Sequence, residues 1–256
     1  MSRLLSWVVL VLGLVLLGAM FLFIRMGVAT DHLHHALVKD PERTPPPGNV
    51  LVAPADGTIL YIRRVEGGII PEAVKRGVSV PLAEHLRLPD DRALEDGWLI
   101  GVYMNSDSVH INRVPLGGTL VDQHIWNGPH MDMSPAESTI MLTQLLPGWV
   151  GLKRMIGLPP YDIEDEADFV LKSARETLVF DDERGKQTFV TRIADFYVGK
   201  ILTWIPVESD VETGQRLGMI TWGSQTDVFF EDSTGLEIKA SVGDFVYGGE
   251  TVLATY

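Results

Sequence analysis

The dipeptide Gly223-Ser224 carries the most distinctive chemistry in this 256-residue chain. Glycine has no Cβ, so its carbonyl carbon can be approached from either face and its backbone can be strained. Serine supplies a hydroxyl that can attack that carbonyl. The pair therefore predicts a bond at which the chain cuts itself, leaving a fragment of 33 residues, Ser224 to Tyr256. A simple Gly-Ser turn is the alternative explanation of the dipeptide taken by itself.

Two further segments carry polar residues in unusual settings. The first is Ala53-Pro54-Ala55-Asp56-Gly57, which by itself indicates a turn capped by its aspartate. The second, Asn105 to Gly117, follows an apolar predicted strand and places His110 and Arg113 three residues apart. A lone histidine is more often structural. The polar run around His110 nevertheless favours a functional site at the end of that strand.

The composition limits the class of protein. A net charge of −13 argues against a nucleic-acid partner, because phosphates require a basic face. It also argues against purely electrostatic adhesion to anionic lipid. The absence of cysteine excludes disulfides, thiolate catalysis and cysteine-based zinc sites. We assign the histidines of Thr30 to Val38 to a polar linker beside a membrane, and we expect no bound metal.

An apolar stretch without charges runs from Leu4 to Ile24 between two arginines. A helix of this length spans roughly 30 Å, the thickness of the hydrocarbon core of a bilayer. The stretch is long for a cleaved signal peptide, and no small-x-small site follows it. We therefore expect a transmembrane anchor in residues 1–28 and a linker in residues 29–48. One arginine on each side leaves the orientation of the anchor open.

The segments that must position the polar motifs have mostly strand character. Runs rich in β-branched and aromatic residues alternate with turns that contain Gly, Pro or Asp. Few helices are expected, and Ser134 to Leu146 has the composition of one, although where it ends is left open. Because no linker divides this part of the chain, we predict one mainly β (α+β) domain over residues 49–256. The predicted strands are 50–52, 58–63, 98–104, 119–125, 176–180 and 188–193, followed by short strands in 196–256.

Two C-terminal segments resemble each other. Ser209 to Leu217 and Asp244 to Val252 share the pattern Val-x-x-Gly-x-x-apolar. The pattern is similar to the turns of biotinyl/lipoyl-like β-sandwiches, so we expect a sandwich element of that kind. A true biotinyl or lipoyl domain would also carry an acceptor lysine at a hairpin tip, and neither Lys200 nor Lys239 is in such a setting.

In this order the three motifs resemble the phosphatidylserine decarboxylase family, and most closely its shorter branch, which includes archaetidylserine decarboxylases. The resemblance is scattered over most of the chain after residue 38. A further segment, 76–86, matches less convincingly, and we assign it no role. The matching segments are Lys39–Arg43, Ala53–Gly57, Val109–Gly117, Gly214–Ile220 and Gly223-Ser224.

The resemblance implies an enzyme that makes its own cofactor. The Ser224 hydroxyl would attack the Gly223 carbonyl to form an ester, and β-elimination would release residues 1–223. Tautomerisation and loss of ammonia would then leave a pyruvoyl group at the head of residues 224–256. The pyruvoyl ketone would form a Schiff base with the substrate amine and accept the electrons released as CO₂ departs. A general acid would protonate the carbanion before hydrolysis releases the amine product.

The resemblance also implies roles for individual residues. Ser224 matches the pyruvoyl precursor, and Gly223 matches the carbonyl donor. His110 matches a catalytic histidine and is the candidate acid–base group. Asp56 matches a catalytic aspartate that would orient the imidazole of His110 and stabilise its charged form. Arg113 is a candidate to bind the substrate carboxylate or phosphate, with a structural salt bridge at the strand end as the alternative.

The chain departs from the family pattern at two positions. The longer bacterial branch has a second histidine where this chain, like the shorter branch, has Arg113. His110 would therefore serve both self-cleavage and decarboxylation. Direct action of Asp56 is the weaker alternative, because a carboxylate near its ordinary pKa is a weak base for a hydroxyl. The second departure is Gln225, which stands where the shorter branch usually has arginine and would alter contacts near the cut.

Two other regions attract attention. His124 and His130, on either side of Trp126-Asn127-Gly128-Pro129, are candidates to line a pocket, although a structural role is the more common one for such histidines. The apolar region from Leu145 to Pro160, which contains Trp149, is either a covered loop or helix, or a segment that dips into the bilayer surface.

We therefore expect a membrane-anchored, self-processing, pyruvoyl-dependent decarboxylase that converts phosphatidylserine to phosphatidylethanolamine and CO₂, with archaetidylserine as the other candidate substrate. Its partners would be the phospholipid, the membrane and its own two fragments, at the cytoplasmic face of a bacterial inner membrane; homo-oligomerisation is left open. The alternative is a membrane-tethered biotinyl-like binding module, or a relative that never cleaves. A hydrolase based on Ser224 is disfavoured, because no Gly-x-Ser-x-Gly elbow surrounds that residue.

Overall fold

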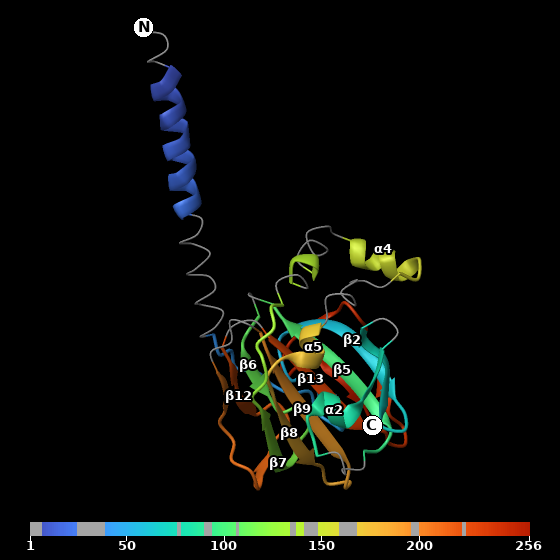
Figure 1. The fold of residues 1–256 in the computed structure, drawn as a ribbon. Helices are drawn as coiled ribbons and strands as arrows, with labels where there is room; N and C mark the ends of the chain where they lie inside the picture. The colour runs from blue at the N-terminus through green and yellow to red at the C-terminus, as the bar shows by residue number, and fades with distance from the viewer. Residues whose placement is uncertain are drawn as a thin grey trace.

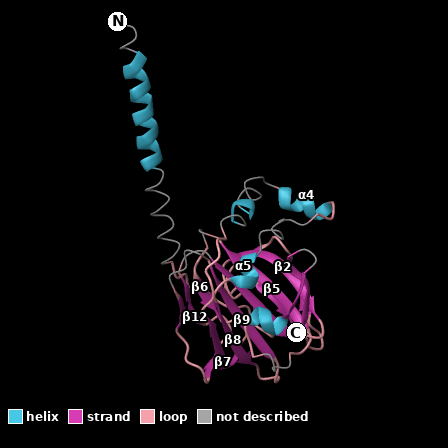
Figure 2. Ribbon diagram, in the orientation of Figure 1, coloured by secondary structure: helices cyan, strands magenta, loops and turns pink. Residues whose placement is uncertain are grey.

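The computed structural model describes ten stretches of the chain, and within them the fold is mainly β with a few short helices and one apolar N-terminal helix (Figures 1 and 2). The mainly β class predicted from the sequence is confirmed. The described residues are 7–24, 39–75, 78–89, 94–105, 108–133, 137–140, 148–158, 168–195, 200–221 and 224–256.

The labelled elements are short apart from the strands of the main sheet. The helices are α2 (Leu82–Leu86), α4 (Trp149–Met155) and α5 (Asp168–Lys172). The strands are β1 (Val50–Val52), β2 (Gly57–Val65), β3 (Ile69–Lys75), β4 (Val78–Pro81), β5 (Gly97–Met104), β6 (Ile111–Arg113), β7 (Gly118–Trp126), β8 (Arg175–Asp181), β9 (Gln187–Ala194), β10 (Ile201–Thr203), β11 (Ser209–Val211), β12 (Arg216–Ile220), β13 (Ser224–Glu231), β14 (Glu237–Ile238), β15 (Phe245–Val246) and β16 (Val252–Thr255).

An eight-stranded sheet in the order β11-β7-β8-β9-β13-β5-β2-β15 is the framework of the domain. β13 lies near its middle and pairs antiparallel with β5 on one side and β9 on the other. Side chains alternate between the two faces of a strand. Phe229 accordingly packs into one hydrophobic core, while Val228 and Phe230 pack into another.

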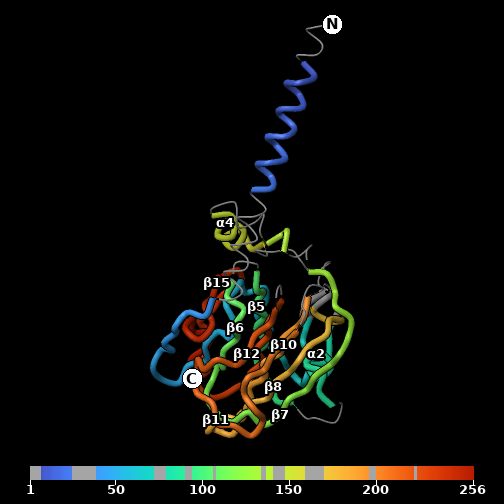
Figure 3. Tube along the Cα trace, turned by 90° about the vertical axis from the view of Figure 1, so that its left-hand side faces the viewer, coloured from blue at the N-terminus to red at the C-terminus, as the bar shows by residue number. Residues whose placement is uncertain are grey.

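Different elements cover the two faces of the main sheet. The core that contains Phe229 is closed by Leu82 and Leu86 of α2 and by Val170 of α5. Figure 1 shows the two helices against the sheet. The opposite core is closed by two small sheets, β1-β16-β14 and β10-β12-β6. Figure 3 shows β6, β12 and β10 side by side on that face. The sheet is therefore buried on both sides over most of its width.

The two similar C-terminal segments form similar turns. In each, a short strand is followed by a glycine with positive φ, +79° at Gly214 and +78° at Gly249, and then by a second strand. The two glycines touch, since a Cβ at Gly249 would lie 3.4 Å from the Cα of Gly214. Left-handed backbone favours glycine at both positions. The two segments that look alike in sequence therefore also have similar backbone structures.

The apolar N-terminal stretch forms the helix Trp7–Ile24, which has a mean hydropathy of 2.9 and is not buried by the rest of the protein. It is one candidate membrane span by length and composition. Residues 25–38, which include the linker histidines, lie outside the described residues. Of the helix predicted over Ser134 to Leu146, residues 137–140 are helical and the rest lies outside the described part.

Candidate functional site

Ser224 is the first residue of β13 and is fully buried. It pairs with Met104 of β5 on one side and with Ala194 of β9 on the other. Its hydroxyl donates to the sulfur of Met104 at 3.2 Å. A thioether is a weak acceptor, so the hydroxyl is removed from water without gaining a strong partner. Gly223 lies outside the described residues.

His110 lies beside the segment that leads into Ser224. Its backbone carbonyl accepts a hydrogen bond from the amide of Ile220, the last residue of β12, at 3.2 Å. Its Nδ1 lies 2.7 Å from the carbonyl oxygen of Ser108. A carbonyl can only accept, so Nδ1 carries the proton of the neutral ring and Nε2 carries the lone pair.

The Nε2 of His110 is in the state expected of a base. It is buried, and it has no hydrogen-bond partner in the described part of the chain. Burial lowers the pKa of His110 below its ordinary value, and the bond to the carbonyl of Ser108 opposes this only in part. The imidazole is therefore neutral at neutral pH and offers a free lone pair.

Asn112 connects β6, the strand that follows His110, to β13 and was not predicted from the sequence. Its side-chain amide donates to the hydroxyl of Thr226 at 3.1 Å and approaches the sulfur of Met104 at 3.5 Å. Thr226 lies two residues after Ser224, on the same face of β13. The motif around His110 is thus brought to the start of β13 by side-chain as well as backbone contacts.

Asp56 is also buried, but it has partners other than His110. One carboxylate oxygen accepts from the amide of Gly248 at 2.7 Å, and the other pairs with Arg43 at 2.8 Å. Burial raises the pKa of Asp56, while the Gly248 amide and the positive charges of Arg43 and Arg113 lower it in part. The expected action of Asp56 on the imidazole of His110 therefore stays a prediction, and the contacts in this structure are different ones. Arg43, from the segment that precedes the turn, occupies the carboxylate, and a backbone carbonyl orients His110.

Arg113 joins the Ala53–Gly57 motif to two further segments that match the family pattern, Lys39–Arg43 and Gly214–Ile220. Its amide donates to the carbonyl of Pro54 at 2.8 Å. Its guanidinium donates to the carbonyls of Gly214 and Pro41 at 3.0 and 2.8 Å and lies 3.3 Å from Asp40. Burial lowers the pKa of Arg113. These contacts match the structural alternative considered for this residue, because they use both terminal nitrogens.

On the opposite face of β13, four buried side chains form a polar cluster. Asp227 accepts from the hydroxyl of Tyr61 at 2.6 Å and lies 2.7 Å from Nε2 of His85. Gln225 donates to the Tyr61 oxygen at 2.7 Å and to Asp227 at 2.6 Å. Burial and the charge of Asp227 raise the pKa of Tyr61, so it remains a donor. Gln225, the residue after Ser224, therefore faces away from the serine.

We predict that Asp227→Ala destabilises the protein more than Tyr61→Phe. Removing the carboxylate leaves the Tyr61, His85 and Gln225 groups without their acceptor, and each buried unsatisfied group costs about 1–3 kcal/mol. We expect a loss of about 3 kcal/mol or more for Asp227→Ala and about 1–2 kcal/mol for Tyr61→Phe. Urea unfolding of full-length protein in matched detergent measures both. Equal stabilities for Asp227→Ala and wild type would show that the cluster contributes nothing.

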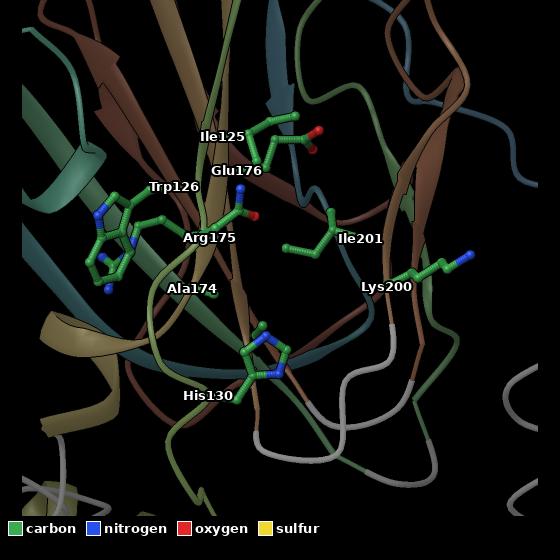
Figure 4. A pocket seen from close by; sticks show the side chains of 10 residues that line it. Ile125, Trp126, His130, Ala174, Arg175, Glu176, Lys200 and Ile201 are labelled. Atoms are coloured by element: carbon green, nitrogen blue, oxygen red, sulfur yellow. The ribbon is translucent and has the colours of Figure 1, made fainter.

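A cavity of about 260 Å³ is shown in Figure 4. Its lining residue Ala194 pairs with Ser224, so the cavity opens at the end of the main sheet where Ser224 lies. Of the two histidines singled out in the sequence, His130 lines it. His124 does not, and its Nε2 instead lies 2.9 Å from a carboxylate oxygen of Asp122. Among the described residues, no group of three or more His, Asp or Glu side chains is arranged to hold a metal ion.

The Ser224 hydroxyl is buried, and the neutral, buried His110 lies on a segment whose backbone bonds to Ile220, four residues before the serine. Such groups are those of enzymes in which a serine oxygen attacks a carbonyl. Comparison with known proteins identifies the family within this class of enzymes. A family model described as phosphatidylserine decarboxylase matches residues 35–254. The chain belongs to the phosphatidylserine decarboxylase family.

Individual relatives agree with the family match. The chain is 28% identical over 216 residues to a phosphatidylserine decarboxylase proenzyme of Trichlorobacter lovleyi, covering 84% of this chain and 73% of the relative. It is 24% identical over 238 residues to the enzyme of the same name from Geotalea uraniireducens, covering 93% and 83%. It is 28% identical over 218 residues to a putative archaetidylserine decarboxylase proenzyme of Methanocaldococcus jannaschii, covering 84% and 86%.

Proposed function

We propose that this protein is a self-processing decarboxylase that converts phosphatidylserine to phosphatidylethanolamine and CO₂. The observation that carries the proposal is the desolvated Ser224 hydroxyl at the start of β13, with the neutral imidazole of His110 on the adjoining segment. The binding-module alternative gains no support from this arrangement, since a module that only binds has no use for a buried nucleophile and base.

In the proposed cleavage, Nε2 of His110 takes the proton of the Ser224 hydroxyl as its oxygen attacks the Gly223 carbonyl carbon. The Gly223–Ser224 amide bond breaks, the amine of Ser224 takes a proton, and an ester links the two residues. Loss of the Cα proton of Ser224 then breaks its Cβ–O bond and releases Gly223 as a carboxylate. The dehydroalanine left behind becomes an imine, and water replaces its nitrogen, which leaves as ammonia.

The strand that would carry the resulting pyruvoyl group fits the role. β13 is paired on both sides from Ser224 to Phe230, so a new chain end at residue 224 would remain held after the cut. Gln225 and Asp227 add contacts to Tyr61 and His85 of the larger fragment. The group would supply a ketone that accepts the electron pair released with CO₂. The protein's part is to hold the substrate and to move protons beside that position.

Other predicted residues keep narrower roles in the proposal. We keep Asp56 as a catalytic participant, because burial raises its pKa towards the range in which a carboxyl group exchanges a proton. The guanidinium of Arg113 can bind the substrate only if it first releases the carbonyls of Gly214 and Pro41. We therefore assign it first to holding the segments around Pro41, Pro54 and Gly214 together. The paired turns at Gly214 and Gly249 support a biotinyl/lipoyl-like sandwich element.

We further propose that the domain of residues 49–256 faces the cytoplasmic side of the inner membrane, anchored by residues 1–28. The linker would be residues 29–48. α4 supports a membrane-facing end: Trp149, Met155 and Ile156 are 41%, 78% and 58% exposed. Figures 1 and 3 place α4 at the end from which the N-terminal helix projects. Apolar side chains exposed beside an anchor would enter the interface of the bilayer.

Denaturing electrophoresis and intact-mass spectrometry of the purified full chain test the proposed function. We expect a 33-residue C-terminal fragment with a blocked N-terminus, together with CO₂ release from phosphatidylserine. Archaetidylserine is assayed in parallel, since the chain is equally similar to a relative named for that lipid. A single uncut band without CO₂ release from either lipid would overturn the proposal.

A further inference from the structure

Part of the cavity lining lies on the same face of the main sheet as the Ser224 side chain. Ala194 lines the cavity and is the residue of β9 that pairs with Ser224. The amide of Ala194 donates to the carbonyl of Ala174, which lines the cavity as well. Both alanines pack in the core that contains Met104, the partner of the serine hydroxyl. The small side chains of Ala174 and Ala194 therefore connect the cavity to the position of residue 224.

The loop that carries His130 is fixed on both sides of the histidine. The carbonyl of Pro129 accepts from the amide of Ala174 at 2.7 Å, and the amide of Met131 donates to Ser173 Oγ at 3.2 Å. Gly128 allows the chain to turn beneath Trp126, because a Cβ there would lie 1.9 Å from the indole ring. Figure 4 shows the imidazole of His130 below Ala174 at the edge of the cavity. The histidine is held in place although it is exposed.

Most of the other ionisable side chains around the cavity are engaged or directed elsewhere. Glu176 pairs with Arg192 and also accepts from Thr203 and Gln123. The side chain of Lys200 points away from Ile201 and the centre of the cavity in Figure 4. Arg175 donates to the carbonyls of His85 and Ser173, while its Nη2 has no hydrogen-bond partner in the described part of the chain. His130 is a ring donor that lines the space, as is the indole of Trp126.

The size and lining of the cavity suit a small anionic head group. Pockets for drug-sized ligands usually measure about 300–1,000 Å³, and this one measures about 260 Å³. It is too small for two acyl chains, which would stay in the bilayer. Ile125 and Ile201 contribute apolar surface to the cavity, and the exposed imidazole of His130 can donate a hydrogen bond to an anionic oxygen there.

We propose that this cavity binds the phosphoserine head group of the lipid, with the serine amine directed along Ala174 and Ala194 towards residue 224 and His130 donating to a phosphate oxygen. His130 is then a residue that determines specificity for a phosphodiester over free serine. The inference rests on the proposed function for the identity of the ligand. The cavity itself is a feature of the uncut chain and can be tested without turnover.

Direct binding to the Ser224→Ala full-length protein in detergent is the first test. The probe is glycerophosphoserine, with free serine as the comparison, measured by isothermal titration calorimetry. We expect glycerophosphoserine to bind more tightly than serine, and His130→Gln to weaken it about tenfold, the scale of one charge-assisted hydrogen bond. His124→Gln, a matched change on β7 outside the cavity, should leave binding unchanged. Equal affinity for the probe with and without His130→Gln would overturn the assignment.

Kinetics of the cleaved enzyme are the second test. With short-chain phosphatidylserine dispersed in detergent, His130→Gln and Ala174→Leu should each cleave fully and raise KM about tenfold, with kcat within about threefold of wild type. Wild-type KM in both variants would overturn the cavity as the head-group site while leaving the proposed function intact. An uncut, inactive wild-type chain that still binds glycerophosphoserine through His130 would overturn the proposed function and support the cavity.

Discussion

Replacing Ser224 with alanine is expected to leave the chain at its full 28.3 kDa and to abolish decarboxylation. The substitution removes the oxygen that must attack Gly223, and no cysteine exists anywhere in the chain to act in its place. Alanine also fits the site, because the serine is fully buried beside Met104 and Ala194 and makes one weak hydrogen bond. The loss should therefore be chemical and not a failure to fold. Intact-mass spectrometry and CO₂ release measure the two consequences.

Thr226→Ser is the matched control for this prediction. It changes a buried side chain on the same face of β13, two residues further on, and keeps the hydroxyl that accepts from Asn112. It should cleave and decarboxylate at close to the wild-type rate. Full turnover by Ser224→Ala, or complete cleavage of that variant, would contradict the assignment of Ser224 as nucleophile and pyruvoyl precursor.

The sequence was sufficient for the framework of the main sheet, because its strands are short apolar runs bounded by turn residues. Val50–Val52 matches β1 in full, and five other predicted strands lie within β2, β5, β7, β8 and β9. β13 was predicted only as part of a series of short strands, although it is eight residues long. Asp227 is of a residue type that is depleted from strands, and Gln225 is a polar residue at a position that the strand buries. Asp227 is stabilised in β13 by Tyr61 and His85, which lie 166 and 142 residues away in the sequence. No local sequence pattern reveals partners at such distances.

The site shows the same limit at the level of single residues. Motif order predicted that the segments around Asp56, His110 and Ser224 would meet, and backbone contacts of Pro54 and Ile220 with the histidine motif bring them together. The sequence did not reveal the cation beside Asp56, because folding brings that cation close without a local pattern, and the action of Asp56 on His110 stays a prediction. Here Arg43 lies within 2.8 Å. Arg43 was in a matching segment but had no assigned role, and its spacing alone did not suggest one.

His110 carries the second large effect, and we expect His110→Gln to slow self-cleavage by about 10²–10⁴-fold, the usual range for loss of a general base. Glutamine is similar in length and can still donate to the Ser108 carbonyl, but it offers no basic nitrogen near neutral pH. The time course of fragment formation after refolding gives the rate. His124→Gln, which removes a histidine paired with Asp122 away from the cavity, is the matched control and should cleave normally.

The pH dependence of cleavage separates a base from a structural histidine. Cleavage needs the neutral ring, and burial places the pKa of His110 below its ordinary value near 6.5. The wild-type rate should therefore be flat through neutral pH and fall only in more acidic solution, below the pH at which an exposed histidine is half protonated. Stability should fall in the same direction, because the unfolded chain binds this proton more tightly than the folded one. In His110→Gln the slow residual cleavage should lose this acidic limb, whereas an unchanged profile would mean that another group supplies the base.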